Sequence, residues 1–292
     1  MKALYDLPAP AKLNLFLHVI GRRDDGYHLL QSAFVLIDWC DTLHIERRDD
    51  GQLARHDLGD ALPPDDLCLR AAALLQQESG TSFGADISID KRLPSGAGMG
   101  GGSSDAATTL LALARLWGLS WPRSRLQALA ARLGADVPFF VGGENAFVEG
   151  IGERLTPITV PRQWLAVVKP AASVATREIF DSPLVVRNTE AVIISGFLAD
   201  ASMVRGFGAG SFGRNDLQPA AMSRCADIGE AARWLEARFG HSRMTGSGSA
   251  VFAGAGTGAQ PMFPLPDDPA PGAVSRMCRS LERHPLRDFA DG

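Results

Sequence analysis

A loop rich in glycine and serine constrains this chain more than any other feature. Residues 94–107 read PSGAGMGGGSSDAA. Before the loop, Ala85 to Asp90 alternates apolar and polar residues, as a half-buried strand does. After it, the run from Ala106 to Trp117 is rich in Ala and Leu and stops at Gly118, which predicts a helix. A glycine loop that leads into a helix exposes backbone N–H groups at the positive end of the helix dipole, and this predicts a phosphate site.

Other common glycine motifs do not explain the loop. The P-loop pattern needs a Lys after its glycines, and the protein-kinase motifs H-R-D and D-F-G do not occur in the chain. Gly96, Gly98 and Gly101 fit the dinucleotide pattern G-x-G-x-x-G. That pattern requires an acidic residue further on to hold the ribose, and none lies between Leu110 and Ala135. A flexible linker is a poor explanation too, because the loop lies inside a strand–helix unit.

Length, charge and cysteine usage narrow the function classes. The 292 residues are enough for two domains with sizeable cores. With a net charge of -4, the chain is a poor general binder of nucleic acid or anionic membranes, so any anion site must be local. The four cysteines are far apart, as in a reduced cytosolic protein, and no apolar run reaches spanning length. We therefore predict a cytoplasmic protein with a small-molecule substrate, no nucleic acid and no membrane, and leave its oligomeric state open.

The coarse pattern of the chain predicts an α+β protein with mixed sheets and helices in both halves. Strands are expected over 11–20, 33–48, 85–90, 146–149, 155–159, 165–169 and 250–253. Further helices are expected over 66–77, 122–133, 176–180, 188–198, 228–239 and 272–283, the first of them capped by Asp65 or Asp66. We predict two domains, residues 1–155 and 156–292, with the active site in the cleft between them.

Lysine is rare in this chain. Only four of the 29 basic Lys and Arg residues are Lys: Lys2, Lys12, Lys91 and Lys169. Where Arg is the default cation, a Lys can mark a place that needs a compact ammonium group. Lys12 lies on the polar face of the strand expected over 11–20, and Lys91 ends the strand before the loop. Both are candidates for phosphate chemistry, and a solvated Lys at a strand end explains Lys91 equally well. Lys2 and Lys169 are expected at the solvated surface.

Four segments, in order, resemble the GHMP small-molecule kinases. They are residues 10–28 (PAKLNLFLH and GRRDDGYH), the loop 94–107, residues 134–140 (GADVPFF) and residues 244–249 (MTGSGS). One such motif would be unspecific, but four in the right order are a specific signal. The triple glycine and the pair Tyr27–His28 resemble the branch of this family whose substrate carries a cytidine diphosphate group.

The resemblance implies an ATP-dependent kinase that transfers a phosphoryl group to an alcohol, with Mg²⁺ arriving on the nucleotide and no metal site built by the protein alone. It makes Asp136 the base that takes the hydroxyl proton and Lys12 the cation that orients Asp136 and offsets developing charge. From the residues alone, Asp136 is equally well explained as part of a helix-ending turn. The nucleotide would contact Lys91, Pro94, Gly96, Ala97, Gly98, Met99, Gly100, Gly101, Gly102, Ser103 and Ser104. Ser103 or Ser104 is expected to cap the helix.

The same resemblance assigns a cytidine-binding end to the site. Tyr27 and Phe180 would stack on the base, His28 would pair with its edge, and Thr176 and Asn14 would contact the rest of the substrate. Ordinary core packing is the other explanation for the two aromatic residues. Two other functions remain open: another GHMP-type kinase, acting on homoserine, mevalonate or a sugar, and a nucleotide-binding protein without catalysis. The Tyr27–His28 pair argues against the first, and the Lys12–Asp136 pair argues against the second.

Overall fold

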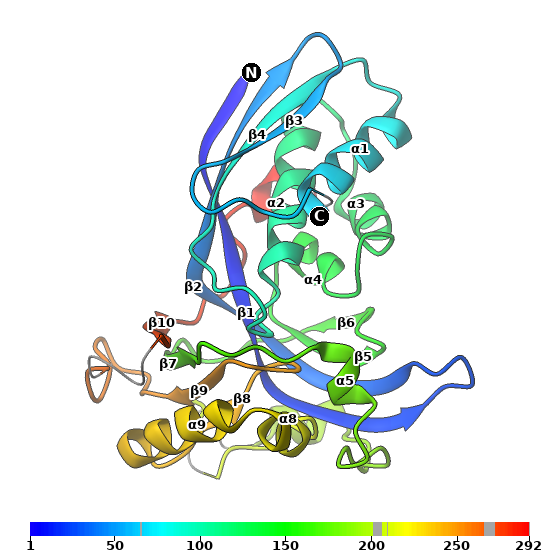
Figure 1. Ribbon diagram of the computed structural model, residues 1–292. Helices are drawn as coiled ribbons and strands as arrows, with labels where there is room; N and C mark the ends of the chain where they lie inside the picture. Colours follow the sequence, from blue (N-terminus) through cyan, green and yellow to red (C-terminus); the bar gives the residue numbers. More distant parts are fainter. Residues whose placement is uncertain (65, 201–205, 209, 266–271, 292) are drawn as a thin grey trace.

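The computed structural model describes residues 1–64, 66–200, 206–208, 210–265 and 272–291. Two layers of sheet and helix lie one above the other, and two long strands run through both (Figure 1). These strands are β1 (Ala3–Arg22) and β2 (His28–Arg48), which pair antiparallel from Ala3↔Glu46 to Arg22↔His28. They were expected as shorter strands, over 11–20 and 33–48. The turn between these strands projects from the lower layer (Figure 1), and Tyr27 and His28 lie where the turn joins β2.

The upper sheet combines β1 and β2 with four shorter strands. Its order is β3-β4-β2-β5-β6, with β1 paired to β2. The added strands are β3 (Leu53–Asp57), β4 (Gly84–Asp90), β5 (Ala146–Gly150) and β6 (Arg154–Pro157). Four helices cover one face of this sheet: α1 (Leu67–Ser79), α2 (Gly101–Leu116), α3 (Arg123–Ala130) and α4 (Val137–Gly142). The middle of α2 consists almost wholly of buried Ala, Thr and Leu residues. Neighbouring elements therefore pack around this helix and fix the position of its N-terminus.

The lower layer holds a second sheet in the order β10-β7-β9-β8. Its strands are β7 (Trp164–Lys169), β8 (Arg243–Met244), β9 (Val251–Gly254) and β10 (Val274–Arg279). The helices of this half are α5 (Thr176–Phe180), α6 (Ile194–Leu198), α8 (Gln218–Arg224) and α9 (Ala226–Phe239). After β10 the chain returns to the upper layer, where the short 3-10 turn η1 (Arg287–Phe289) packs near α2. The predicted α+β class is confirmed. The division at residue 155 stays a prediction.

Two predicted helices are wrong or too long. Residues 272–283 contain β10, which pairs with β7 from Val274↔Lys169 to Arg279↔Trp164. Exposed and half-buried residues alternate from Val274 to Met277, which is the period of two of a strand. Of 188–198, only α6 is helical. Before it, the side chain of Gln31 pairs with both backbone groups of Val192 (2.7 and 3.0 Å), which removes the need for helical hydrogen bonds.

Two helix starts are informative for the site. Asp66 caps α1 by accepting hydrogen bonds from backbone N–H groups, Leu69 among them at 3.1 Å, as expected; Asp65 lies outside the described residues. Helix α2 starts at Gly101, five residues before the expected Ala106, with Gly100 in the cap position and no side-chain cap. The expectation that Ser103 or Ser104 caps it is therefore wrong. Both serines lie inside its first turn, because the glycines themselves are helical.

In the part of the chain that the structure describes, no helix is both long and apolar enough to cross a membrane.

Candidate active site

The glycine loop lies between the two layers and packs backbone to backbone on a second glycine turn, residues 245–249. Ser249 N–H donates to the carbonyl of Gly96 and Ala250 N–H to that of Ala97, both at 3.1 Å. Gly98 has a φ of +73°, and a Cβ there would collide with the carbonyl of Thr245. Glycine is required here because no side chain fits between the two backbones. The tertiary contact, and not the loop alone, fixes the shape of the glycine loop.

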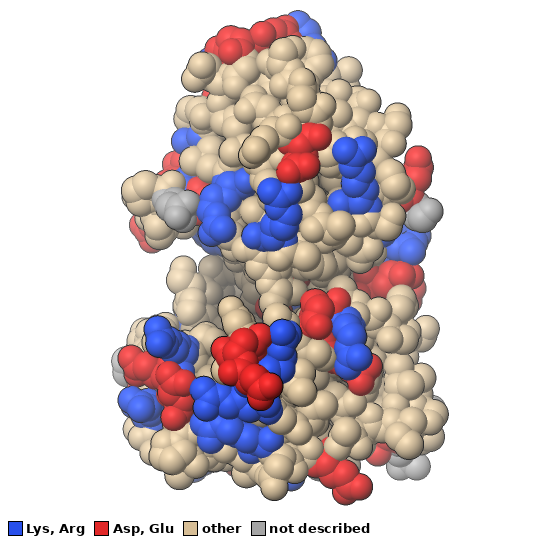
Figure 2. Space-filling model, turned by 90° about the vertical axis from the view of Figure 1, so that its right-hand side faces the viewer, with Lys and Arg blue, Asp and Glu red and all other residues tan. Residues whose placement is uncertain are grey.

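Two cavities open on either side of the loop, with volumes of about 840 and 290 Å³. Figure 2 shows the surface hollowed between the upper and lower halves, with acidic and basic side chains mixed around it. Gly98 and Gly100 line both cavities. The larger also includes Lys12, Asn14, Tyr27, His28, Ser103, Asp136, Thr176 and Phe180. The smaller also includes Lys91, Pro94, Gly96, Ala97, Met99, Gly101 and Gly102. Of the predicted site residues only Ser104 lines neither; its hydroxyl is buried with no partner among the described residues.

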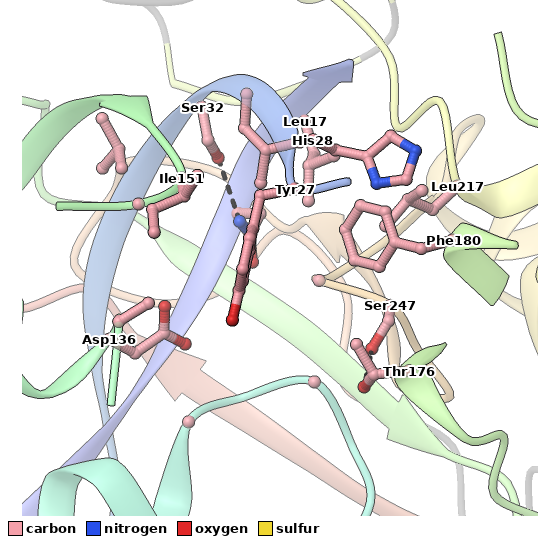
Figure 3. A pocket seen from close by; sticks show the side chains of 18 of the residues that line it. Leu17, Tyr27, His28, Ser32, Asp136, Ile151, Thr176, Phe180, Leu217 and Ser247 are labelled. Carbon is pink, nitrogen blue, oxygen red and sulfur yellow. Dashed lines mark hydrogen bonds between the residues drawn. The ribbon is translucent and has the colours of Figure 1, made fainter. Parts of the chain in front are cut away.

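Lys12 and Asp136 meet in the larger cavity. The Lys12 ammonium lies 3.5 Å from Asp136 Oδ2, and the Lys12 side chain is 4% exposed while that of Asp136 is 31% exposed. Asp136 stands directly before α4 and makes no capping hydrogen bond, so its carboxylate is turned to the cavity (Figure 3). The geometry therefore combines a buried cation with an accessible carboxylate, which can accept a proton from a bound hydroxyl.

Asn14 is a hydrogen-bond partner of Lys12. Its Oδ1 accepts a hydrogen bond from Lys12 Nζ at 2.7 Å and one from Thr245 at 3.1 Å, and its Nδ2 donates to Ser32 at 2.9 Å. The ring of Phe34 lies 4.3 Å from Lys12 Nζ and stacks under the charge. Asn14 also lines the larger cavity, so its expected contact with substrate stays a prediction. Its contacts within the protein orient the ammonium group of Lys12.

Lys91 is bound within the protein. Its ammonium bridges Asp105 of α2 (2.6 Å) and Asp41 of β2. Asp41 also accepts from the backbone N–H groups of Arg92 (2.6 Å) and Leu93 (2.7 Å), directly before the loop. Burial lowers the pKa of Lys91, but the two carboxylates outweigh it and raise that pKa overall, so Lys91 stays charged. Lys91 lines the smaller cavity, and its ion pairs join the start of the loop to β2 and α2. Its contact with the nucleotide stays a prediction.

Lys169 was expected at the surface and is instead buried, at 5% exposure. Its ammonium donates to the carbonyls of Pro170 (2.7 Å) and Ala172 (3.0 Å) and to Ser173 Oγ (3.0 Å). Ser173 in turn lies where a Cβ on Gly96 would fall, at 2.7 Å. Lys169 therefore shapes the segment that supports the glycine loop from the lower layer. Lys2 is exposed, as expected.

Aromatic side chains form the far end of the larger cavity (Figure 3). Tyr27 is 61% exposed, and the rings of His28 and Phe180 lie 5.0 Å apart between centroids. Thr176 starts α5, and its hydroxyl meets that of Ser247 at 2.7 Å. Tyr27, His28 and Phe180 all line this end of the cavity, and the space that they border is called the aromatic slot below. Ser247 belongs to a segment that the sequence marked as a motif, but its contact with Thr176 was not expected.

The fold and the glycine site define a GHMP kinase. Residues 66–144 match the model of the GHMP kinases N terminal domain. The chain is similar over its whole length to a 4-diphosphocytidyl-2-C-methyl-D-erythritol kinase of Methylibium petroleiphilum, with 64% identity over 292 residues and 99% of each chain covered. It belongs to the family of 4-diphosphocytidyl-2-C-methyl-D-erythritol kinases.

Solved structures agree with this assignment. A crystal structure of 4-(cytidine 5'-diphospho)-2C-methyl-D-erythritol kinase matches with a TM-score of 0.76 and 33% identity, covering 94% of this chain and 99% of the other. A homoserine kinase from Cytophaga hutchinsonii matches with a TM-score of 0.67 over 97% of this chain and 96% of the other, and its 15% identity shows the fold alone. The predicted GHMP resemblance and the predicted ATP-dependent small-molecule kinase are confirmed.

Proposed function

We propose that this protein uses ATP to phosphorylate the 2-hydroxyl of 4-diphosphocytidyl-2-C-methyl-D-erythritol, giving the 2-phosphate and ADP. The reaction belongs to the methylerythritol phosphate route to isoprenoid precursors, which does not pass through mevalonate. One observation carries the proposal: the Lys12–Asp136 pair lies in a single cavity with the phosphate loop on one side and an aromatic slot on the other. The relatives named above bear the name of this kinase.

The nucleotide belongs in the smaller cavity, with its phosphates at the glycine loop. The first turn of α2 begins at Gly101, so its leading N–H groups have no acceptor within the helix. They point, with the helix dipole, to where phosphate oxygens would lie. Gly98 and Gly100 line both cavities, so a terminal phosphoryl group at these residues faces Lys12 and Asp136. In this arrangement the nucleotide that donates the phosphoryl group and the alcohol that accepts it lie on opposite sides of one loop.

Asp136 takes the proton of the attacked hydroxyl, and the bond from that oxygen to the γ-phosphorus forms as the bond to ADP breaks. Lys12 holds the Asp136 carboxylate at 3.5 Å and offsets negative charge that develops on the phosphoryl group. Asn14 keeps Lys12 in this place through its 2.7 Å hydrogen bond. Burial of Lys12 strengthens its interaction with both anions, because water does not screen it.

A magnesium ion fits this site as a companion of the nucleotide. Within the described residues no three His, Cys, Asp or Glu side chains are grouped to hold a metal. Kinase Mg²⁺ needs few protein ligands, since phosphates and water supply the others. Ser103, whose side chain borders the larger cavity, is the protein oxygen that we expect to hold it. Bound there, the ion would neutralise charge on the phosphates.

A substrate panel tests the proposal. ATP turnover is measured with the cytidyl compound, mevalonate and homoserine, and with CDP as a competitor. We expect turnover with the cytidyl compound alone and competition by CDP. Phosphorylation of mevalonate or homoserine without CDP binding would contradict the substrate and leave a GHMP kinase. ATP binding without turnover on any alcohol would indicate a nucleotide-binding protein.

Replacing Gly101 by Val tests the position of the nucleotide. Gly101 has no positive φ, and a Cβ there meets Leu93 and Lys91 no closer than 3.4 Å, so the fold tolerates the change. The added side chain occupies the smaller cavity, and we expect the KM for ATP to rise by about tenfold or more, with the cytidyl KM and Tm unchanged. Gly100→Val is not equivalent, because Gly100 has a φ of +73° and a Cβ there lies 3.0 Å from Phe140.

Gly196→Val is the matched control for this experiment, since Gly196 lies in α6 with nothing within 4 Å of its Cβ position. We expect both KM values of this control to equal those of the parent. A Gly101→Val protein with equal losses for both substrates and a lowered Tm would show that Gly101 serves folding.

A further inference from the structure

Arg187 contacts two walls of the aromatic slot, the His28 ring and the end of α5 that carries Phe180. Its Nε donates to Nε2 of His28 at 3.1 Å. Its Nη2 donates to the carbonyls of Phe180 (2.7 Å) and Ser182 (2.8 Å), at the end of α5. His28 comes from the β1–β2 hairpin and Phe180 from the second layer, so one guanidinium group links the His28 ring to the backbone at the end of α5.

The hydrogen bond also fixes the protonation of His28. Guanidinium groups only donate, so the Nε2 atom that receives this bond carries no proton. The imidazole is then neutral and bears its single proton on Nδ1. Among the charged groups near the ring, Arg187 and Arg22 oppose protonation and Asp181 favours it. Burial is the largest influence and, with the two arginines, lowers the pKa of His28.

The free nitrogen faces the slot. Figure 3 draws one ring nitrogen of His28 on the side of Tyr27 and Phe180 and the other turned away from them. Since Nε2 is bonded to Arg187, the inner nitrogen is Nδ1. No hydrogen bond to this Nδ1 occurs among the described residues. A donor without a partner therefore points into the slot where the base is proposed to stack.

We propose that Arg187 is a positioning residue that holds His28 in the neutral Nδ1–H form, so that the slot presents a hydrogen-bond donor to an acceptor on the edge of a pyrimidine. This inference rests on the proposed function for the identity of the ligand, but the tautomer can be tested without it. Nothing in the sequence around Arg187 marks it, because its partner His28 lies 159 positions away.

The test uses ¹⁵N-histidine-labelled full-length protein, with the His28 signals assigned from their absence in His28→Asn. In the parent we expect a protonated Nδ1 and an unprotonated Nε2. In Arg187→Met we expect a mixture of tautomers, an affinity for CDP lowered by about tenfold and an unchanged KM for ATP. Arg224→Met is the matched control, because Arg224 also contacts α5, through Glu178 at 3.4 Å, but not His28.

If Arg187→Met does not fold, a second pair of variants tests which nitrogen of His28 serves the ligand. Asn in place of His28 puts an amide group near the Nδ1 position, and Gln puts one near Nε2. We expect His28→Asn to bind CDP several-fold more tightly than His28→Gln. A protonated Nε2 in the parent, or tighter binding by His28→Gln, would overturn the inference. A parent that shows the expected tautomer but neither binds CDP nor phosphorylates the cytidyl compound would instead overturn the proposed function.

Discussion

Replacing Asp136 by Asn is expected to lower turnover by roughly 10²–10⁴-fold, the usual contribution of a general base. The amide has the shape of the carboxylate but cannot accept the hydroxyl proton. Asp136 has no capping hydrogen bond and its side chain is 31% exposed, so the fold tolerates the change, but the buried Lys12 ammonium loses its charged partner. Steady-state kinetics should show a lower kcat at nearly unchanged KM for ATP, with a moderately lower Tm.

Asp181→Asn is the control for this variant. Asp181 lines the same cavity, but its carboxylate pairs with Arg177 at 3.8 Å and not with Lys12. We expect at most a small change in its turnover. A near-normal kcat for Asp136→Asn would remove Asp136 from the mechanism and leave it as a residue of the turn before α4.

Replacing Lys12 by Met is expected to lower kcat by about 10²-fold or more, because the variant loses the cation that faces both the base and the phosphoryl group. Met keeps much of the length and apolar stem of Lys, so packing against Phe34 survives. Two groups lose a partner, since Asn14 Oδ1 and Asp136 both face the ammonium at 2.7 and 3.5 Å. A moderate loss of thermal stability is therefore expected beside the kinetic effect.

Lys2→Met controls for the loss of one positive charge, because Lys2 is exposed and its ion pair with Asp49 spans 4.0 Å. Its kinetics should match those of the parent. If Lys12→Met raised the KM for ATP and left kcat unchanged, Lys12 would be a phosphate ligand and not the partner of the base.

Local sequence patterns predicted many residues that the structure brings together around the two cavities. Glycines next to a helical run mark a phosphate loop because backbone conformation and exposed N–H groups are local properties. Asp66 was one of the two predicted caps for the same reason, since its partner at 3.1 Å, Leu69 N–H, lies three residues away. Where spacing was ambiguous, local patterns failed. Residues 272–283 were expected as a helix, but they contain β10, a strand that pairs with β7.

Contacts between distant residues were decided by the tertiary structure alone. The burial of Lys169, the engagement of Asn14 by Lys12, Thr245 and Ser32, and the bond from Arg187 to His28 leave no trace in local composition. The sequence by itself determined the residue types of the glycine loop, because close backbone approach requires glycine, and its resemblance to the GHMP kinases singled out Lys12 and Asp136. Only the tertiary structure decided which side chains are exposed to ligand and which are bound within the protein, because hydrogen-bond partners and burial depend on segments that meet only in the folded chain.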